Sequence, residues 1–277
     1  MNSSNNPDDF LPFPPFPDAL AEKYAAKHLG LRPFGIVESD LAIDFAKKNN
    51  PALVTLILEQ CTTSLNKALP TDFFQDLSIG KRLECLLWLA RGFNERQAFS
   101  FLFKCHSCQL ELEFELTLAE IAEQQREADL KESIEIETGG RKLVFRKPLG
   151  RDQENWQNFS FPDERAAALT LAKRLQTSPD EALEIRDEAL ALIDEAMDEA
   201  DPLVNFNCRV RCFDCDSVNE FPVDLYDFAL GELNRAQNRL LNAVHRLASR
   251  YHWSEKEIFA VPHWRRMQYL NLIAEKR

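Results

Sequence analysis

Two Cys-x-x-Cys loops stand about a hundred residues apart in the chain, the first formed by Cys105 and Cys108 and the second by Cys212 and Cys215. A loop of this kind presents two thiolates to one ion, and a structural zinc site closes with four such ligands in a tetrahedron. The spacing therefore predicts one structural Zn²⁺ that is shared by the two loops. The fold must then bring these two distant segments together.

The residues that follow each loop favour a metal site over a redox site. A redox pair stands at a helix N-terminus, where the helix dipole lowers the thiol pKa. Here residues 110–116 alternate apolar and acidic side chains, which predicts a half-buried strand, and Val218, Phe221 and Val223 follow the second loop. A cysteine loop followed by a strand is typical of zinc ribbons. Four reduced thiols without a metal are the alternative.

Two further residues are possible ligands. Cys208, with Cys212 and Cys215, matches the spacing that holds an iron–sulfur cluster in radical enzymes, but 8 Gly in 277 residues leave little room for the glycine-rich cofactor loop of such enzymes. His106 lies inside the first loop, where a histidine is usually solvated. Whether Cys208 or His106 replaces one of the four cysteines is left open.

The composition is that of a globular protein without a membrane span. Hydrophobic residues make up 45% of the chain, and no apolar run approaches the ~20 residues that a span needs. The N-terminus lacks the basic start and apolar segment of a signal peptide. Seven cysteines fit a reducing compartment. We therefore expect a cytoplasmic protein.

The charge is unevenly distributed. The formal net charge of −12 argues against general nucleic-acid binding, because neutralising phosphates supplies most of that affinity. Residues 231–277, however, hold nine Lys and Arg against four Glu, and so have a net charge of +5. An acidic body with a basic end predicts docking onto an acidic partner or self-association.

The pattern predicts a predominantly helical α+β fold in four regions, with a zinc-ribbon-like β element made from the two loops and flanked by helices. The first region, residues 1–35, is an extended arm rich in Pro and Phe. Its Phe10, Leu11, Phe13 and Phe16 are expected to be buried on another subunit, with a disordered tail as the alternative. The other regions are a helical half with the first loop (36–125), a hairpin and acidic helical insertion (126–200), and the second loop with the C-terminal helices (201–277).

Local signals place the elements within these regions. Short helices are expected at 18–31 and 39–49, a strand at 99–103, a hairpin at 134–146 through Gly139-Gly140, and a helix at 163–175. Capping boxes predict helix starts at Thr117, Ser178 and Ser254. A long helix from about Asp224 has apolar residues at heptad spacing, and only Gln237 interrupts this seam.

The sequence lacks the motifs of common enzymes: there is no G-x-S-x-G, no phosphate-binding glycine loop, no G-x-G-x-x-G after a strand and no H-E-x-x-H. We therefore expect no catalytic site. The alternative function is a zinc-containing DNA-binding regulator with a degenerate helix-turn-helix at 240–275, because Ala248, His252 and Ile258 have the spacing of that motif. Its recognition helix would contain Glu255 and Glu257, which disfavour DNA contact.

The segments C-F-D-C-D-S-V-N-E-F-P-V-D-L-Y-D-F and A-V-H-R-L-A-S-R-Y-H-W-S-E-K-E-I-F resemble the T-even-type phage baseplate hub assembly chaperone family, members of which also occur in extracellular contractile injection system clusters. A weaker likeness includes the first loop, residues 142–152 and Asp201-Pro202, and so covers roughly residues 70–277. The chain departs from the family by having His252 where glycine is common, an extra Cys208, and its Phe/Pro-rich N-terminus.

The resemblance implies a non-enzymatic component of a phage tail-like contractile particle. Such a protein would help to assemble the baseplate hub, or would remain in it, and would bind spike, inner-tube or other baseplate proteins.

Overall fold

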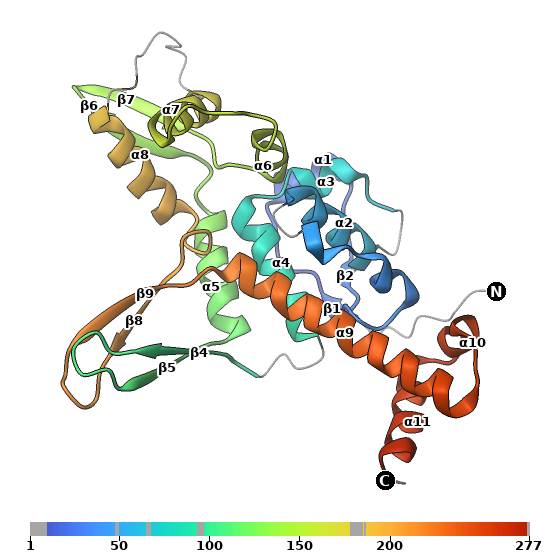
Figure 1. The fold of residues 1–277 in the computed structure, drawn as a ribbon. Helices are drawn as coiled ribbons and strands as arrows, with labels where there is room; N and C mark the ends of the chain where they lie inside the picture. Colours follow the sequence, from blue (N-terminus) through green and yellow to red (C-terminus); the bar gives the residue numbers. More distant parts are fainter. Residues whose placement is uncertain are drawn as a thin grey trace.

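The computed structural model describes residues 10–47, 50–64, 68–92, 97–177, 185 and 187–275. The fold is α+β, with more residues in helices than in small antiparallel sheets, as the sequence predicts (Figure 1). The α-helices are α1 (Asp18–Tyr24), α2 (Pro51–Cys61), α3 (Thr71–Gln75), α4 (Ile79–Arg91), α5 (Leu118–Asp129), α6 (Gly150–Trp156), α7 (Glu164–Leu175), α8 (Asp187–Ala200), α9 (Leu225–Tyr251), α10 (Glu255–Ala260) and α11 (His263–Glu275).

Two short 3-10 helices, η2 (Glu38–Ala42) and η3 (Phe45–Lys47), precede α2. The strands are β1 (Leu11–Pro12), β2 (Leu29–Leu31), β3 (Thr62–Ser64), β4 (Phe99–Lys104), β5 (Glu111–Leu116), β6 (Ile134–Thr138), β7 (Arg141–Phe145), β8 (Asn207–Arg211) and β9 (Val218–Pro222). Among the helices that the structure describes, none has the length and apolar character that a membrane crossing requires.

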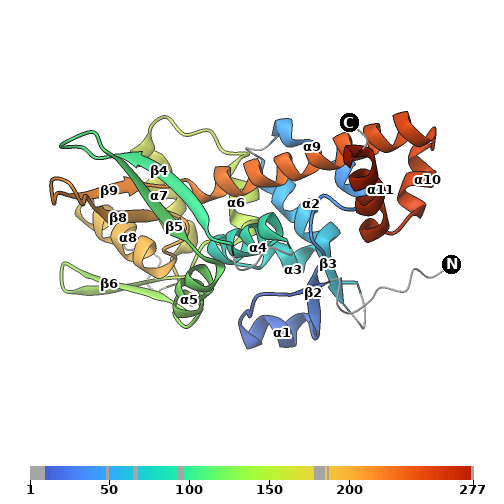
Figure 2. The same ribbon diagram turned by 90° about the horizontal axis from the view of Figure 1, so that it is seen from below.

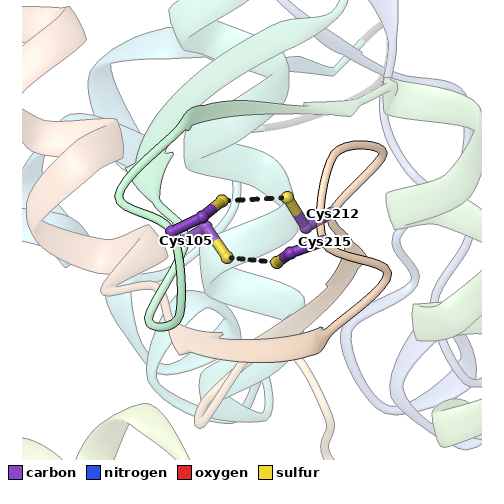
Figure 3. A group of neighbouring side chains, drawn as sticks. Cys105, Cys212 and Cys215 are labelled. Atoms are coloured by element: carbon purple, nitrogen blue, oxygen red, sulfur yellow. Dashed lines mark hydrogen bonds between the residues drawn. The ribbon is translucent and has the colours of Figure 1, made fainter.

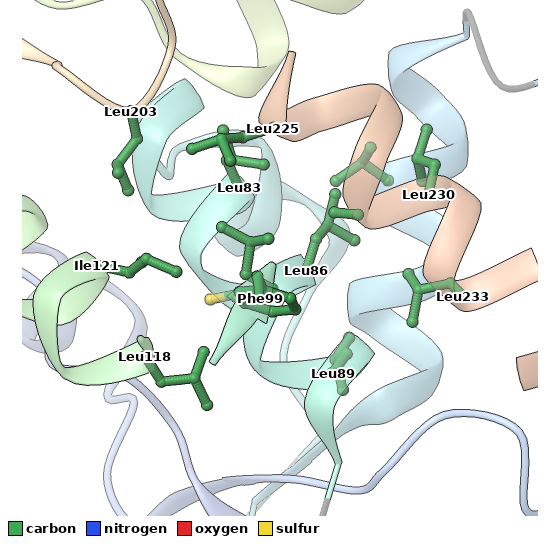
Figure 4. Close-up of a cluster of buried hydrophobic side chains, with 14 of the residues drawn as sticks. Leu83, Leu86, Leu89, Phe99, Leu118, Ile121, Leu203, Leu225, Leu230 and Leu233 are labelled. Carbon is green, nitrogen blue, oxygen red and sulfur yellow. The ribbon is translucent and has the colours of Figure 1, made fainter. Parts of the chain in front are cut away.

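Helix α4 lies at the centre of the main core. Ser78 caps its N-terminus by accepting a hydrogen bond from the Lys81 amide, and Gly92 ends it with a φ of 55°. Residues 79–87 and Leu89 of this helix are all buried, including Lys81, Arg82 and Glu84, so the helix is surrounded by protein. Leu86 and Leu89 pack in the same cluster as Leu230 and Leu233 of α9 (Figure 4). The packing of α4 on α9 joins the two halves of the chain.

The predicted strands around the cysteine loops are confirmed. Strands β4 and β5 form an antiparallel hairpin in which Phe99 pairs with Leu116 and Lys104 with Glu111, and β8 and β9 form a second one. Both hairpins lie at one end of the molecule, α10 and α11 lie at the other, and α9 runs between the two ends (Figure 2). The cysteine loops are the turns of these two hairpins.

The N-terminal segment packs on its own chain, so the prediction that it is buried on another subunit is wrong. Leu11 and Phe13 are buried in the main core, and the Phe16 ring lies edge-on to Phe73 at 5.4 Å between centroids. Residues 1–9 lie outside the described part of the chain.

The helices expected at 18–31 and 39–49 form only in part. Helix α1 ends at Tyr24, and β2 pairs with both β1 and β3 in a three-stranded sheet. Residues 38–47 form η2 and η3 in place of an α-helix. The β2–β3 pairing joins segments more than thirty residues apart along the chain, and such a pairing leaves no signal in a local pattern.

Residues 134–200 have a separate small core. The predicted hairpin is confirmed: β6 pairs with β7 through Gly139 and Gly140, whose φ angles are 59° and 73°. Helices α7 and α8 cover it, and Ile136, Phe145 and Ile193 are buried between them. Asp163 caps α7, as the predicted helix start requires. The predicted capping box at Ser178 lies outside the described residues.

A buried polar joint connects this part to α4. The carboxylate of Asp201 accepts a hydrogen bond from the Gly80 amide at 3.0 Å. The Lys81 ammonium lies 2.5 Å from a Glu84 oxygen and 2.7 Å from an Asp129 oxygen. The Lys147 ammonium donates to the backbone oxygen of Ala128. Buried charges of this kind need such partners, because their desolvation is costly.

Helix α9 confirms the predicted heptad seam and explains its interruption. Leu230, Leu240 and Leu247 are buried along one face. Gln237 donates to the backbone oxygens of Asp40 and Ile43 at 2.7 and 2.8 Å, and so satisfies two carbonyl groups of the η2 region. The seam therefore packs on segments of the same chain.

The C-terminal helices fold back on α9. The chain turns at His252, which has a φ of 56°, in the left-handed region that favours glycine. The predicted capping box at Ser254 is confirmed, and Glu257 completes it. Tyr251, Trp253 and Tyr269 then form an aromatic cluster with centroid distances of 4.9 to 5.4 Å.

Candidate metal centre

Each cysteine loop is closed by backbone hydrogen bonds around its first cysteine. In the first loop, the Cys105 amide donates to the Leu110 oxygen at 2.8 Å, and the Gln109 amide donates to the Cys105 oxygen at 3.0 Å. Gln109 has a φ of 63°, which turns the chain back into β5. This geometry leaves both cysteine side chains on one side of the turn.

The second loop repeats this geometry. The Cys212 amide donates to the Ser217 oxygen at 2.9 Å, and the Asp216 amide donates to the Cys212 oxygen at 3.0 Å. Asp216, in the position that matches Gln109, has a φ of 61°. Two segments with different sequences thus adopt the same turn, as two loops that serve one ion require.

All four predicted cysteines lie together. The Sγ atoms of Cys105 and Cys215 are 3.6 Å apart, those of Cys108 and Cys212 are also 3.6 Å apart, and all four atoms lie within 4.8 Å of one another (Figure 3). A tetrahedral ion with bonds of about 2.3 Å places its sulfur ligands about 3.8 Å apart. A disulfide would bring two sulfurs to about 2.05 Å. The spacing therefore suits a metal ion, and the cysteines are not disulfide-bonded.

The two loops are held in place by aromatic packing between the hairpins. The Phe103 and Phe221 rings stack with centroids 4.3 Å apart and an interplanar angle of 4°. The ring centroids of Phe101 and of Phe228 in α9 are 4.8 Å apart. The hairpins are therefore fixed against each other and against α9 before any ion is considered.

Ser217 and Asn219 complete the site, and the sequence analysis missed both. The Ser217 hydroxyl lies 3.2 Å from the Cys105 sulfur and 3.1 Å from the Cys215 sulfur. Asn219 is only 1% exposed; its side chain accepts from the His106 amide at 2.8 Å and donates to the Ser217 oxygen at 3.1 Å. Asn219 therefore links the first loop to the second. Alternation counted back from the buried Phe221 would have placed this amide on the inner face.

The thiol pKa values reflect the crowding of the four sulfurs. The Ser217 hydroxyl is the main cause that lowers the pKa of Cys105, to about 5, and it also lowers the pKa of Cys215. For Cys108 the Leu110 amide acts to lower the pKa, but desolvation and the neighbouring sulfur atoms outweigh it and raise the pKa to about 12. Four thiolates this close need a cation, because like charges raise one another's proton affinity.

The other candidate ligands lie outside the cluster. Cys208 is buried in β8 and pairs across the hairpin with Phe221. The centroid of the His106 ring lies 4.9 Å from that of Phe221, edge-on, and His106 is not among the residues of the four-cysteine cluster. Cys61 and Cys85 are buried in the main core, as expected for packing residues. Among the described residues, the four cysteines form the one cluster of this kind.

A site with four sulfur donors can hold a soft or borderline metal ion, since thiolates prefer such ions over Mg²⁺ or Ca²⁺. One cysteine of each loop is buried, Cys105 and Cys212, and the other, Cys108 and Cys215, is exposed. The cluster thus lies at the surface of the hairpin pair. Comparison of the chain with family models, with curated proteins and with solved structures gave no match.

Proposed function

We propose that the chain is a non-enzymatic assembly factor or structural subunit of the baseplate hub of a contractile tail-like particle, and that a structural Zn²⁺ holds its two hairpins together. The observation behind the proposal is the four-thiol cluster. Four protein sulfurs fill a tetrahedral coordination shell, whereas a catalytic zinc keeps one position for water or substrate. The donor set therefore favours a structural role.

The place of the cluster suggests how the ion acts. The β4–β5 hairpin connects α4 to α5, and the β8–β9 hairpin leads into α9. Helices α4 and α9 pack at the base of the hairpins, and the ion would join their tips. The two hairpins would then form one rigid zinc-ribbon-like element. Binding energies of structural zinc sites are about 10 to 16 kcal/mol in small domains, enough to hold such an element in one geometry.

The choice of partners follows from the family resemblance. The resembling segments include the second loop, β9, the start of α9 and the α9–α10 junction. In the fold, these segments form the metal centre and the turn at His252. Spike, inner-tube or other baseplate proteins are the partners that this resemblance implies. The protein would act in the cytoplasm, on or in the growing particle.

The DNA-binding alternative has less support. Helix α10, the recognition helix in that reading, has only 6 residues, and Glu255 and Glu257 lie exposed in its first turn. Phosphate backbones repel such a surface. Of the described basic residues of this end, Lys256 lies on α10 and the others on α9 and α11.

Two measurements test the proposal. Elemental analysis of the purified protein should find one zinc per chain. The tagged chain, expressed with the genes that neighbour its own, should co-purify with hub, spike or tube proteins. Absence of a bound transition metal would rule out the structural-zinc role. Recovery of no particle protein, together with a steeply salt-dependent shift of DNA fragments, would favour the regulator instead.

A further inference from the structure

A groove is lined by α9, α11, residues 33–36 and the C-terminal end of α4. Helix α11 and the C-terminal end of α9 lie at the end of the molecule opposite the two hairpins (Figure 2). The volume of the groove is about 630 Å³. The C-terminal half of α9 forms one wall and α11 the other. The groove is therefore separate from the metal centre and is formed by the basic end of the chain.

The floor of the groove is apolar and has helical periodicity. Helix α9 contributes Leu240, Ala243 and Leu247, and α11 contributes Met267, Leu270 and Ala274. These positions are three or four residues apart, so each helix presents one continuous stripe to the same space. The three leucines are at most 7% exposed, so an occupant would reach mainly Ala243, Met267 and Ala274. Two converging stripes of this kind form the receptor for a third, amphipathic helix.

The groove is lined by four arginines, Arg91, Arg239, Arg246 and Arg266, and no Asp or Glu is among the described residues that line it. Arg239 and Arg246 are exposed and lie two turns apart on the same side of α9. In a protein with a formal net charge of −12, such a concentration of positive charge is a local feature. It selects an acidic occupant.

Arg266 provides an independent indication of an acidic occupant. It is 7% exposed, and its guanidinium lies 4.9 Å from the Phe259 ring. One guanidinium nitrogen donates to the Ile36 oxygen, but Nε has no acceptor, and no carboxylate of the described residues forms an ion pair with it. A buried cation without an acidic partner is costly. A carboxylate supplied from outside would complete its surroundings.

We propose that this groove binds an amphipathic helical segment of a partner protein, with the apolar face on Ala243, Met267 and Ala274 and with flanking Asp or Glu side chains paired to the groove arginines. The inference rests on the proposed role as an interaction protein, but it does not depend on the metal. It specifies the chemistry of the partner segment: acidic, helical and apolar on one face.

The test uses a fluorescein-labelled synthetic helix of about four turns, with Leu at every third or fourth position and Glu beside them. Fluorescence anisotropy with the full chain should show saturable binding. Arg239→Glu combined with Arg246→Glu should weaken binding at least about tenfold, because two attractive contacts become repulsive. Ala243→Trp, which fills the floor, should weaken it as well. Arg209→Glu, an exposed charge reversal in the distant β8, is the matched control and should bind normally.

Several results would overturn the proposal. A peptide of the same composition without the apolar stripe should not bind, and equal binding would reduce the effect to bulk charge. Unchanged binding by the double arginine variant would exclude the groove. Self-association that the double variant abolishes would assign the groove to a second copy of the chain. Saturable binding of dodecanoate by a chain that does not bind the acidic helix would assign the groove to anionic lipids.

The outcome is separable from that of the proposed function. If the peptide binds but no particle protein is recovered, the groove proposal is supported and the hub role is rejected. If particle proteins are recovered equally well by the arginine variant, the hub role is supported and the groove proposal is rejected.

Discussion

Gly80 shows how a single side chain would disturb the joint between α4 and the rest of the fold. A Cβ atom at this position would lie 1.8 Å from Asp201 Oδ1 and 2.7 Å from Gln125 Oε1. In an open helix, Gly→Ala stabilises by up to about 1 kcal/mol. We expect Gly80→Ala to destabilise the protein by about 1 to 3 kcal/mol, because it displaces a buried carboxylate. Urea unfolding measures the difference.

Gly231 in α9 is the matched control for this substitution. The nearest atom to its added Cβ is an Arg235 nitrogen 3.9 Å away. Gly231→Ala should therefore leave stability unchanged or raise it by up to about 1 kcal/mol. Equal effects at the two positions would contradict the close approach at Gly80.

Glu84 makes stability depend on pH near neutrality. Burial raises the pKa of this carboxyl from its ordinary 4.5 to about 7, although the nearby Lys81 acts to lower it. The folded state therefore holds a proton that the unfolded chain releases between about pH 4.5 and 7. The contribution of this residue to stability is present below that interval and falls as the pH rises through it, by at most about 1.4 kcal/mol per pH unit.

Glu84→Gln removes this titration. We expect the free energy of unfolding of the variant to change less between about pH 5 and about pH 7.5 than that of the native protein. Guanidinium unfolding at several pH values across this interval measures the difference. An identical pH dependence in both proteins would show that Glu84 is not the titrating group.

The cysteines of the two loops should act as a unit. Cys108→Ser combined with Cys215→Ser removes one candidate ligand from each loop, so the variant should no longer bind the proposed zinc and should lose the stability that the ion would give to the hairpins. Cys208→Ala, in the adjacent strand, should retain the full zinc content because its sulfur lies outside the cluster. Zinc retention by the double serine variant would contradict the assignment of the ligands.

At the scale of elements, α9 tests whether a polar residue in an apolar seam is a defect. By pattern alone, Gln237→Leu would complete the heptad and stabilise the helix. We expect the opposite, a loss of about 1 to 3 kcal/mol, because the Asp40 and Ile43 oxygens would lose their donor. A stabilised Gln237→Leu variant in thermal unfolding would show that water replaces the amide.

The sequence predicted elements where the signal is local. Capping boxes at Thr117 and Ser254, the Gly139-Gly140 turn and the spacing of the cysteines each lie within a few residues, and the structure confirms them. Contacts that join distant segments could not be read in this way. The buried Asn219 and the Lys81–Glu84 pair have polar side chains whose partners only the tertiary fold supplies.

At the scale of the whole molecule, the N-terminal segment shows the same limit. Proline and phenylalanine in residues 10–17 indicate an extended apolar strip but do not specify which surface it covers. In the structure, Phe13 and Phe16 lie against Phe73 of α3. The predicted partner was wrong, because these side chains pack on their own chain.

Metal removal should loosen one end of the molecule selectively. The cluster joins the hairpin tips, whereas α4 and α9 pack through leucines such as Leu86 and Leu230, which are not ligands. A zinc chelator should increase hydrogen exchange in β4, β5, β8 and β9 and leave the amides of α4 and the first half of α9 protected. Uniform loss of protection would mean that the ion stabilises the entire fold.

Cys108 and Cys215 are exposed residues, so the proposed zinc ion could be loaded after folding. An ion arriving from solvent would reach the cluster beside these two residues, and no core residue would have to move aside. A cell short of zinc would accumulate chains that are already folded and lack only their ion. Supplying zinc later would mature this stock without new protein synthesis.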